Sequence, residues 1–314
     1  MSKISELLAQ IKNLEIQTKD LVEGIQSGAY NSKFRGGGIE FSEVREYVPG
    51  DDVKRIDWNV SARHNSLFVK EFVEENELNI YLILDLSASN NFGFIKSKLD
   101  LSFEVAVSLM FLALKNNDKL GLGIFTDKLE KFIPSKKGKK QLLRIIKELI
   151  DYTPKSKKTD IMESLSTLNN KLKRKSVIYI ISDFISDFIS DSYKKPLKFL
   201  KLHHKVILIN ISDIREKEIP EIGYAYLEDA ETGEQVLVDT SNKQFQKQYT
   251  EYVSEKMKTD KKNMNRIGID MININNEESF DITINRYFRN KGKMSNWWSL
   301  DLSMHYFFFY WFHF

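Results

Sequence analysis

The sequence of 314 residues contains no cysteine, and this absence removes several kinds of chemistry. Disulfide bonds, thiolate metal centres and cysteine nucleophiles are all excluded. Histidine is also scarce, with five residues, and none of them belongs to a recognisable catalytic triad. A metal site in this chain is therefore expected to depend on oxygen ligands.

The chain also lacks a strong excess of one charge and a long apolar segment. Its 47 lysine and arginine residues nearly balance 44 acidic residues, whereas a nucleic-acid or membrane-surface binder would need a concentrated basic face. Residues 1–17 carry charges every few positions and do not resemble a signal peptide. The main body has no apolar run near the roughly 20 residues of a membrane helix. We therefore expect a cytoplasmic protein that binds no nucleic acid.

Apolar strands alternate with helical segments from residue 79 onward. This pattern predicts a doubly wound, mostly parallel sheet with helices on both faces. A hairpin, a charged helix, a strand and a last helix then complete a domain expected to span residues 77–290. The expected strands are 80–84, 120–125, 176–181, 206–211 and 268–274, the hairpin is 225–240, and the helices are near 96–115, 139–150, 160–173, 193–203, 243–258 and 277–288.

The first 76 residues have a different composition. Apolar residues at three- and four-residue spacing predict an amphipathic helix over residues 4–25. Residues 36–72 are rich in glycine, charge and β-formers, and predict short strands on either side of a turn at Pro49-Gly50-Asp51. We expect residues 1–76 to form this helix and a small β-rich subdomain that packs beside the larger domain. Trp58 should be at least partly buried there, because a large aromatic side chain gains more from burial than from exposure.

Oxygen-bearing side chains follow three segments of the expected sheet domain. Asp85, Ser87 and Ser89 stand at the end of the first apolar strand, Thr159 precedes a helix, and Asp183 ends another strand. Because ligands bind at the carboxyl ends of strands in such sheets, we expect these side chains to converge. Carboxylates and hydroxyls suit Mg²⁺ or Mn²⁺. Each residue alone is also typical of a helix cap, but the ordered set favours a metal site.

One carboxylate of this set needs a choice. The repeated segment ISDFISDFISD also offers Asp187 and Asp191. We assign Asp183 because it directly follows the apolar strand.

Two motifs resemble known protein groups. The pattern Asp85-x-Ser87-x-Ser89, followed by Thr159 and Asp183, resembles the metal-ion-dependent adhesion site of von Willebrand factor type A domains. The segment REYVPGDDVKRIDWN at residues 45–59, preceded by GGIEF at residues 37–41, resembles the hallmark of domain-of-unknown-function family fifty-eight.

The second likeness covers roughly residues 20–290. It implies a bacterial protein with a von Willebrand factor type A-like fold, working with a MoxR-type AAA+ ATPase. Asn90 stands where the family often has Met, which is beside the metal motif and not in it.

Charges of alternating sign fill the hallmark segment. They favour a local ion-pair network around a turn, and the alternative is a surface on which a partner docks. The candidate partner-binding residues are Arg45, Tyr47, Asp51, Asp52, Arg55, Asp57 and Trp58.

These observations favour a non-enzymatic, metal-dependent protein-binding module. The resemblance implies that it acts with the MoxR-type ATPase in the assembly or maturation of a client protein that the sequence does not identify. One alternative is a metal-dependent phosphoryl hydrolase, but Ser87 stands where the second carboxylate of an Asp-x-Asp pair would be. The other alternative is a metal-free structural scaffold.

The segment after residue 290 has an unusual composition. Residues 294–314 are dense in aromatic side chains, and their apolar part is too short to cross a bilayer. We expect residues 291–314 to lie outside the folded domain. The rival interpretation is an interfacial membrane anchor, and this tail is the only segment through which we expect membrane contact. An interfacial helix would normally carry a basic face, and no lysine or arginine follows Lys293.

Overall fold

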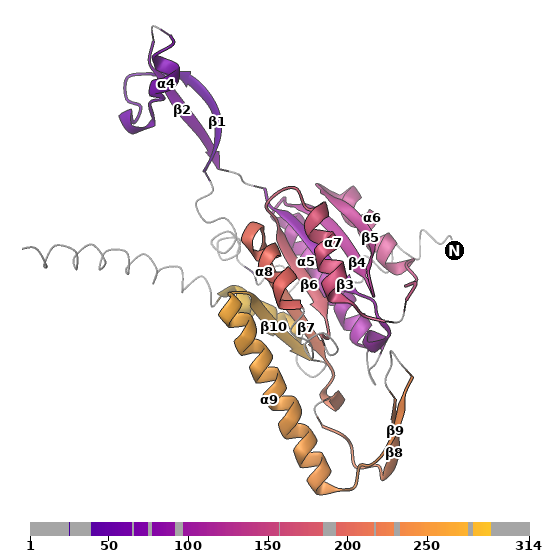
Figure 1. Ribbon diagram of the computed structural model, residues 1–314. Coiled ribbons are helices and arrows are strands. Elements are labelled where there is room, and N and C mark those ends of the chain that lie inside the picture. The colour runs from indigo at the N-terminus through magenta and orange to yellow at the C-terminus, as the bar shows by residue number, and fades with distance from the viewer. Residues whose placement is uncertain are drawn as a thin grey trace, which may run out of the picture.

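The structure is a computed structural model of the chain (Figure 1). It describes residue 25 and residues 39–64, 66–74, 77–91, 97–156, 158–184, 193–216, 218–228, 233–275 and 279–289. The strands are β1 (Ile39–Glu46), β2 (Phe68–Glu74), β3 (Asn79–Asp85), β4 (Lys119–Phe125), β5 (Leu129–Lys136), β6 (Val177–Ser182), β7 (Lys205–Ser212), β8 (Tyr224–Glu228), β9 (Gln235–Asp239) and β10 (Asp270–Asn275). The helices are α4 (Trp58–Ser61), α5 (Lys98–Lys115), α6 (Lys139–Ile150), α7 (Ile161–Lys171), α8 (Lys194–His203) and α9 (Lys243–Ile267), with short 3-10 turns η1 (Val53–Arg55), η2 (Ala88–Asn91) and η5 (Ile214–Glu216).

A six-stranded sheet in the order β10-β7-β6-β3-β4-β5 forms the centre of the larger domain. Its first five strands are parallel, and only the edge strand β5 runs antiparallel to its neighbour β4. The predicted α/β fold with a mostly parallel sheet is therefore confirmed. Strand β5 was not among the predicted strands, because its half-buried residues lack the continuous apolar run of the inner strands.

Both faces of the sheet are covered by helices, so the inner strands bury side chains in two directions. On β3, Ile80, Leu82 and Leu84 face a core shared with α5 and α6. The alternate residues Tyr81 and Ile83 face a second core, shared with α7 and α8. This alternation explains why all seven residues of β3 are buried.

Strand β4 contains two glycines where neighbouring side chains need space. A Cβ atom at Gly121 would lie 2.4 Å from the Tyr81 ring, and one at Gly123 would lie 2.7 Å from Cδ1 of Ile83. The Tyr81 ring stacks on Phe132, with ring centroids 5.5 Å apart. The glycines thus allow the larger side chains of β3 to lie over β4.

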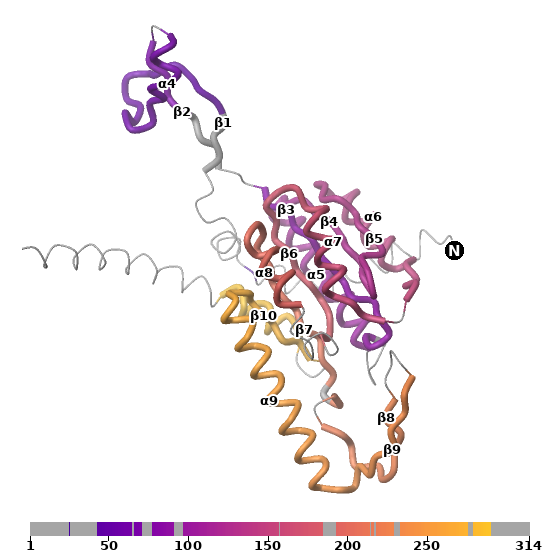
Figure 2. The backbone as a smooth tube through the Cα atoms, in the orientation of Figure 1, coloured from indigo at the N-terminus to yellow at the C-terminus, as the bar shows by residue number. Residues whose placement is uncertain are grey.

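Residues 39–64 and 66–74 form a separate small unit. Strands β1 and β2 pair antiparallel, and Ile56 bridges to Val69 beneath the turn. Figures 1 and 2 show this unit standing away from the sheet, so the predicted packing against the larger domain is not found among the described residues. The predicted burial of Trp58 is wrong, since its side chain is 64% exposed. Ile56, at 7% exposure, takes the buried position instead.

The segments after β7 follow the predicted order. Strands β8 and β9 form the expected hairpin, and α9 extends beyond its predicted end to Ile267, where Gly268 closes it with a positive φ of 68°. Residues 280–289 are helical and bury Ile284 and Phe288 in the core. No helix of the described ranges is both long and apolar enough to cross a membrane.

Two predicted segments lie mainly outside the described residues. Of the predicted helix 4–25, only Ile25 is described, and it is buried. The aromatic tail 291–314 lies entirely outside them.

Candidate metal-binding site

Asp85 ends the central strand β3 and is almost completely buried, at 1% exposure. Its Oδ1 accepts a hydrogen bond of 2.9 Å from the backbone N–H of Ser87. Its Oδ2 accepts one of 2.6 Å from the hydroxyl of Ser182, the last residue of the neighbouring strand β6. Burial, and then the negative charge of Asp183, raises the pKa of Asp85 to about 6. The carboxylates at the ends of β3 and β6 are therefore close enough to repel each other.

The hydroxyls of Ser87 and Ser89 lie side by side just beyond Asp85. Their Oγ atoms are 3.1 Å apart, and the Ser87 Oγ also accepts a hydrogen bond of 3.2 Å from the Asn90 side-chain amide. The Oδ1 atom of Asn90 is buried and has no hydrogen-bond partner within the described ranges. The turn η2 thus gathers several oxygen atoms beside a buried carboxylate.

Thr159 lies on the loop that enters α7, at the same edge of the sheet. The backbone N–H of the next residue, Asp160, donates a hydrogen bond of 3.0 Å to the carbonyl of Thr126, just after β4. The Asp160 side chain caps α7 by accepting a hydrogen bond of 3.0 Å from the Glu163 backbone. Asp160 thus acts as a helix cap, whereas the half-buried Thr159 keeps its predicted place on a loop at the strand ends.

Asp183 follows β6 directly, and it forms an ion pair that the sequence analysis missed. The ammonium of Lys98, the first residue of α5, lies 2.6 Å from Asp183 Oδ2 and 2.5 Å from Glu216 Oε1. Burial opposes the charge of Lys98, but the two carboxylates outweigh it and raise the lysine pKa. Burial raises the pKa of Glu216, although Lys98 acts against this shift. The alternatives Asp187 and Asp191 lie outside the described residues.

Three members of this group were therefore not identified from the sequence: Ser182, Lys98 and Glu216. Ser182 immediately precedes Asp183, so its position at the end of an apolar strand was a usable signal. Lys98 starts a helix and Glu216 stands in a charged loop, and residues of these types in such places are usually solvated. Only the three-dimensional structure brings them together.

The donor set fits a divalent cation of the Mg²⁺ type. Two buried carboxylates repel each other at Asp85 and Asp183, and a cation between such groups would relieve that repulsion. The described residues include no cluster of three or more His, Cys, Asp or Glu side chains arranged as metal ligands. The candidate set therefore depends on hydroxyls, because three of its five members are Ser87, Ser89 and Thr159.

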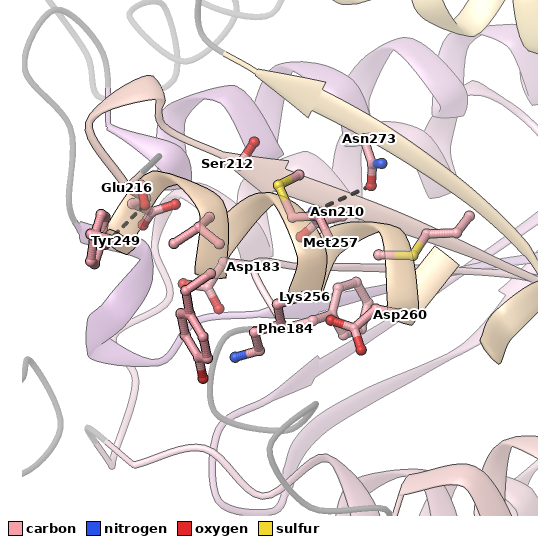
Figure 3. Close-up of a pocket in the computed structure, with 13 residues that line it drawn as sticks. Asp183, Phe184, Asn210, Ser212, Glu216, Tyr249, Lys256, Met257, Asp260 and Asn273 are labelled. Atoms are coloured by element: carbon pink, nitrogen blue, oxygen red, sulfur yellow. Dashed lines mark hydrogen bonds between the residues drawn. The ribbon is translucent and has the colours of Figure 1, made fainter. Parts of the chain in front are cut away.

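A pocket of about 240 Å³ borders this group and lies between the sheet and α9 (Figure 3). Asp183 and Glu216 line it, together with apolar and aromatic side chains that include Phe184, Tyr252, Val253, Met257 and Met271. The Tyr249 hydroxyl of α9 donates a hydrogen bond of 2.9 Å to the carbonyl of Glu216, which joins α9 to η5.

The floor of the pocket includes a buried amide. Asn210 of β7 donates a hydrogen bond of 3.3 Å from Nδ2 to Oδ1 of Asn273, while its own Oδ1 has no partner in the part of the chain that is described. The pocket therefore offers an apolar wall and one buried hydrogen-bond acceptor beside the acidic pair.

In the hallmark segment, most charged side chains form local contacts. Arg45 donates two hydrogen bonds to Asp51, of 2.7 and 2.8 Å, and Asp51 also accepts one from the Val48 backbone. Asp57 caps α4 and lies 3.4 Å from the ammonium of Lys70, while Asp52 accepts a hydrogen bond from the Lys54 backbone. These contacts agree with the predicted ion-pair network around the turn.

Other side chains of the same unit face solvent. Val48 and Val53 are each 59% exposed, and Trp58 is 64% exposed. Arg55 is exposed as well, and Tyr47 is half-buried. The acidic residues of this segment thus stabilise the turn, whereas Trp58 and Arg55, two of the candidate partner-binding residues, are exposed.

Comparison with known proteins places these features in one family. The family model described as "Protein of unknown function DUF58" matches residues 43–259. The uncharacterized protein Rv1480 of Mycobacterium tuberculosis is 31% identical over 232 residues, which cover 73% of this chain and 72% of that protein. The family description assigns no enzymatic activity.

Solved structures with a similar chain path are more distant. The conserved hypothetical protein BatB from Bacteroides thetaiotaomicron is 15% identical, with a TM-score of 0.43 over 69% of this chain and 99% of that one. A von Willebrand factor type A protein from Catenulispora acidiphila is 10% identical, with a TM-score of 0.33 over 47% of this chain and 36% of that one.

Proposed function

Because the chain belongs to the DUF58 family of proteins of unknown function, we propose its role from its own residues: a non-enzymatic, metal-dependent protein-binding module. Mg²⁺ or Mn²⁺ would be held by Asp85, Ser87, Ser89, Thr159 and Asp183. The observation that carries the proposal is the pair of buried carboxylates on neighbouring strands, placed beside a turn of hydroxyls. A bound ion would supply an electrophilic position that accepts a carboxylate from a partner protein.

The partner that we propose is a MoxR-type AAA+ ATPase, together with a client protein that is assembled or matured in the cytoplasm. Two surfaces support a docking role. The pocket under α9 begins at Asp183 and Glu216, so it could receive an apolar side chain that neighbours a metal-bound carboxylate. The exposed Val48, Val53 and Trp58 of the hallmark unit form a second accessible set, which an apolar surface of a partner would cover.

Metal titration tests the first part of this proposal. We expect calorimetry at millimolar Mg²⁺ or Mn²⁺ to show binding to the wild type and none to Asp85→Ala, because the buried carboxylate is removed. The variant should stay folded, since Asp85 is the last residue of β3 and belongs to neither of the two hydrophobic clusters. Glu148→Ala is the charge-matched control, because Glu148 lies on α6 and pairs with Lys131 at the surface. Absence of binding to the wild type would contradict the site.

Partner binding is tested with the purified ATPase of the same organism. We expect capture in Mg²⁺, loss with a chelator, loss in Asp85→Ala, and retention in Glu148→Ala. Trp58→Ala should weaken capture without changing metal affinity if the hallmark unit contributes to docking. Metal-dependent hydrolysis of a phosphate ester that disappears in Asp85→Ala would overturn the non-enzymatic role.

A further inference from the structure

Lys98 is buried to an extent that is unusual for a lysine. Its side chain is 1% exposed, although it is the first residue of α5 and could have pointed to solvent. Lysine is almost never fully buried unless it is paired, because removing an ammonium from water costs several kcal/mol. Here the ammonium lies 2.6 Å from Asp183 and 2.5 Å from Glu216.

The carboxylates of Asp183 and Glu216 come from different loops, and only Asp183 belongs to the candidate metal site. Asp183 directly follows β6, and Glu216 lies in η5 after β7. Asp183 therefore acts on two groups: its charge affects Asp85, and its Oδ2 atom pairs with the ammonium of Lys98. Asp183 is a proposed ligand of the divalent ion. An ammonium and a divalent ion would each balance the negative charge of its carboxylate, so they compete for it.

We propose that Lys98 is a built-in competitor of the divalent ion, occupying Asp183 when metal is absent and releasing it when metal binds. This inference rests on the proposed metal site. Glu216 would hold the ammonium in both states, so the charge of Lys98 would not be left unpaired after release.

The surroundings of Glu216 allow this exchange. Its side chain is 20% exposed, against 3% for Asp183, so an ammonium that remains on Glu216 alone is closer to water. Both carboxylates also line the pocket under α9, which provides space on their open side. The consequence is a site whose metal affinity is held down until a partner adds a further ligand to the ion.

The test is the Mn²⁺ affinity of Lys98→Met, which keeps the length of the side chain and removes its charge. We expect this variant to bind Mn²⁺ at least about tenfold more tightly than the wild type in calorimetry, a difference of about 1.4 kcal/mol. Without metal its unfolding temperature should fall below that of the wild type, because two buried carboxylates lose a cation. Added Mn²⁺ should raise that temperature more in the variant than in the wild type.

Lys140→Met is the matched control, because Lys140 is an exposed lysine of α6 and its loss changes the net charge equally. Asp85→Ala combined with Lys98→Met should bind no Mn²⁺. If Lys98→Met alone does not fold, the double variant Lys98→Met with Glu216→Gln removes one negative charge as well. This double variant should bind Mn²⁺ more tightly than Glu216→Gln alone, by the same factor.

The outcomes separate this inference from the proposed function. Tighter Mn²⁺ binding by Lys98→Met than by the wild type supports the competition. Equal affinities of wild type and variant overturn the competition and leave the metal site intact. Absence of binding to both proteins overturns the metal site and the competition together.

Discussion

At the scale of single residues, buried and exposed carboxylates of this chain are controlled by opposite effects. Burial and a neighbouring negative charge raise the pKa of Asp85 to about 6. At Asp51, the hydrogen bonds from Arg45, followed by that from the Val48 backbone, lower the pKa to about 2. At Asp51 the guanidinium of Arg45 balances the carboxylate charge, whereas the charge that acts most on Asp85 is another carboxylate.

The Arg45–Asp51 pair gives a pH prediction for the hallmark unit. Because the folded pKa of Asp51 lies below its ordinary value of 3.8, this residue stabilises the fold at pH values above 3.8. That contribution is lost as the pH falls toward about 2. We expect Arg45→Ala to move the titration midpoint of the Asp51 carboxyl upward toward 3.8, measured by carbon NMR.

Arg45→Lys is the control for this measurement. It keeps the positive charge but loses the two parallel hydrogen bonds of the guanidinium, so it should give an intermediate midpoint. A midpoint that stays near 2 in Arg45→Ala would show that the arginine does not cause the shift.

At the scale of elements, the two glycines of strand β4 leave no space for an added methyl group unless a neighbour moves. We expect Gly121→Ala to lower the free energy of unfolding by about 1–3 kcal/mol, measured in urea, because overpacking forces neighbours to move. The Tyr81 ring cannot move easily, since it stacks on Phe132 and its hydroxyl accepts a hydrogen bond from the Ser135 backbone.

Gly123→Ala is the matched variant. Its new methyl would meet Cδ1 of Ile83, the end of a side chain that can change rotamer, so the loss should be smaller than at Gly121. Adding Ile83→Val removes that atom and should recover part of the loss in a double-mutant cycle. Equal losses at Gly121 and Gly123, with no recovery, would show that the side-chain contacts are not the cause.

The strands of the sheet show how much of the fold could be predicted from the sequence. The inner strands were predictable because buried parallel strands are continuous apolar runs, as in β3 and β6. The candidate metal-site residues were inferred from their places at the ends of these strands. Strand β5 was not predictable in this way, because its residues are half-buried at the edge of the sheet. The burial of Lys98 was not predictable either, because its partner Glu216 is 118 positions away. Such contacts leave no local periodicity in a sequence.

Trp58 shows a different limit. The prediction assumed that a large aromatic residue next to Ile56 would be buried with it. A small unit has little interior, and Ile56 and Val69 are the buried residues among those of this unit whose burial is described. Whether Ile56 or Trp58 is buried depends on the backbone path of the turn, and the composition of the segment does not define that path.

At the scale of the whole molecule, the end of the folded domain can be tested by shortening the chain. Ile284 and Phe288 are each 1% exposed and belong to the core beside α5. We expect removal of residues 291–314 to leave the unfolding temperature and metal binding unchanged and to raise solubility, as the composition of that segment predicts. Thermal unfolding measures the effect on stability, and the protein concentration at saturation measures the effect on solubility.

Phe288→Ala in the shortened chain provides the contrast. It should lower the free energy of unfolding by about 3–5 kcal/mol, because it empties a buried position. Loss of cooperative unfolding on removal of residues 291–314 alone would place the tail in the core, and liposome binding that depends on the tail would favour the membrane anchor.

The ion pair between Lys98 and Glu216 has a consequence for the history of the family. It joins the start of α5 to η5 across 118 positions. Loss of Lys98 alone would remove the cation that faces Glu216, and loss of Glu216 alone would leave Asp183 to hold the buried ammonium by itself. Substitutions at the two positions should therefore be inherited together. In an alignment of family members, sequences with a neutral residue at position 98 should also have lost the carboxylate at position 216, and lineages that replaced only one of them should be rare.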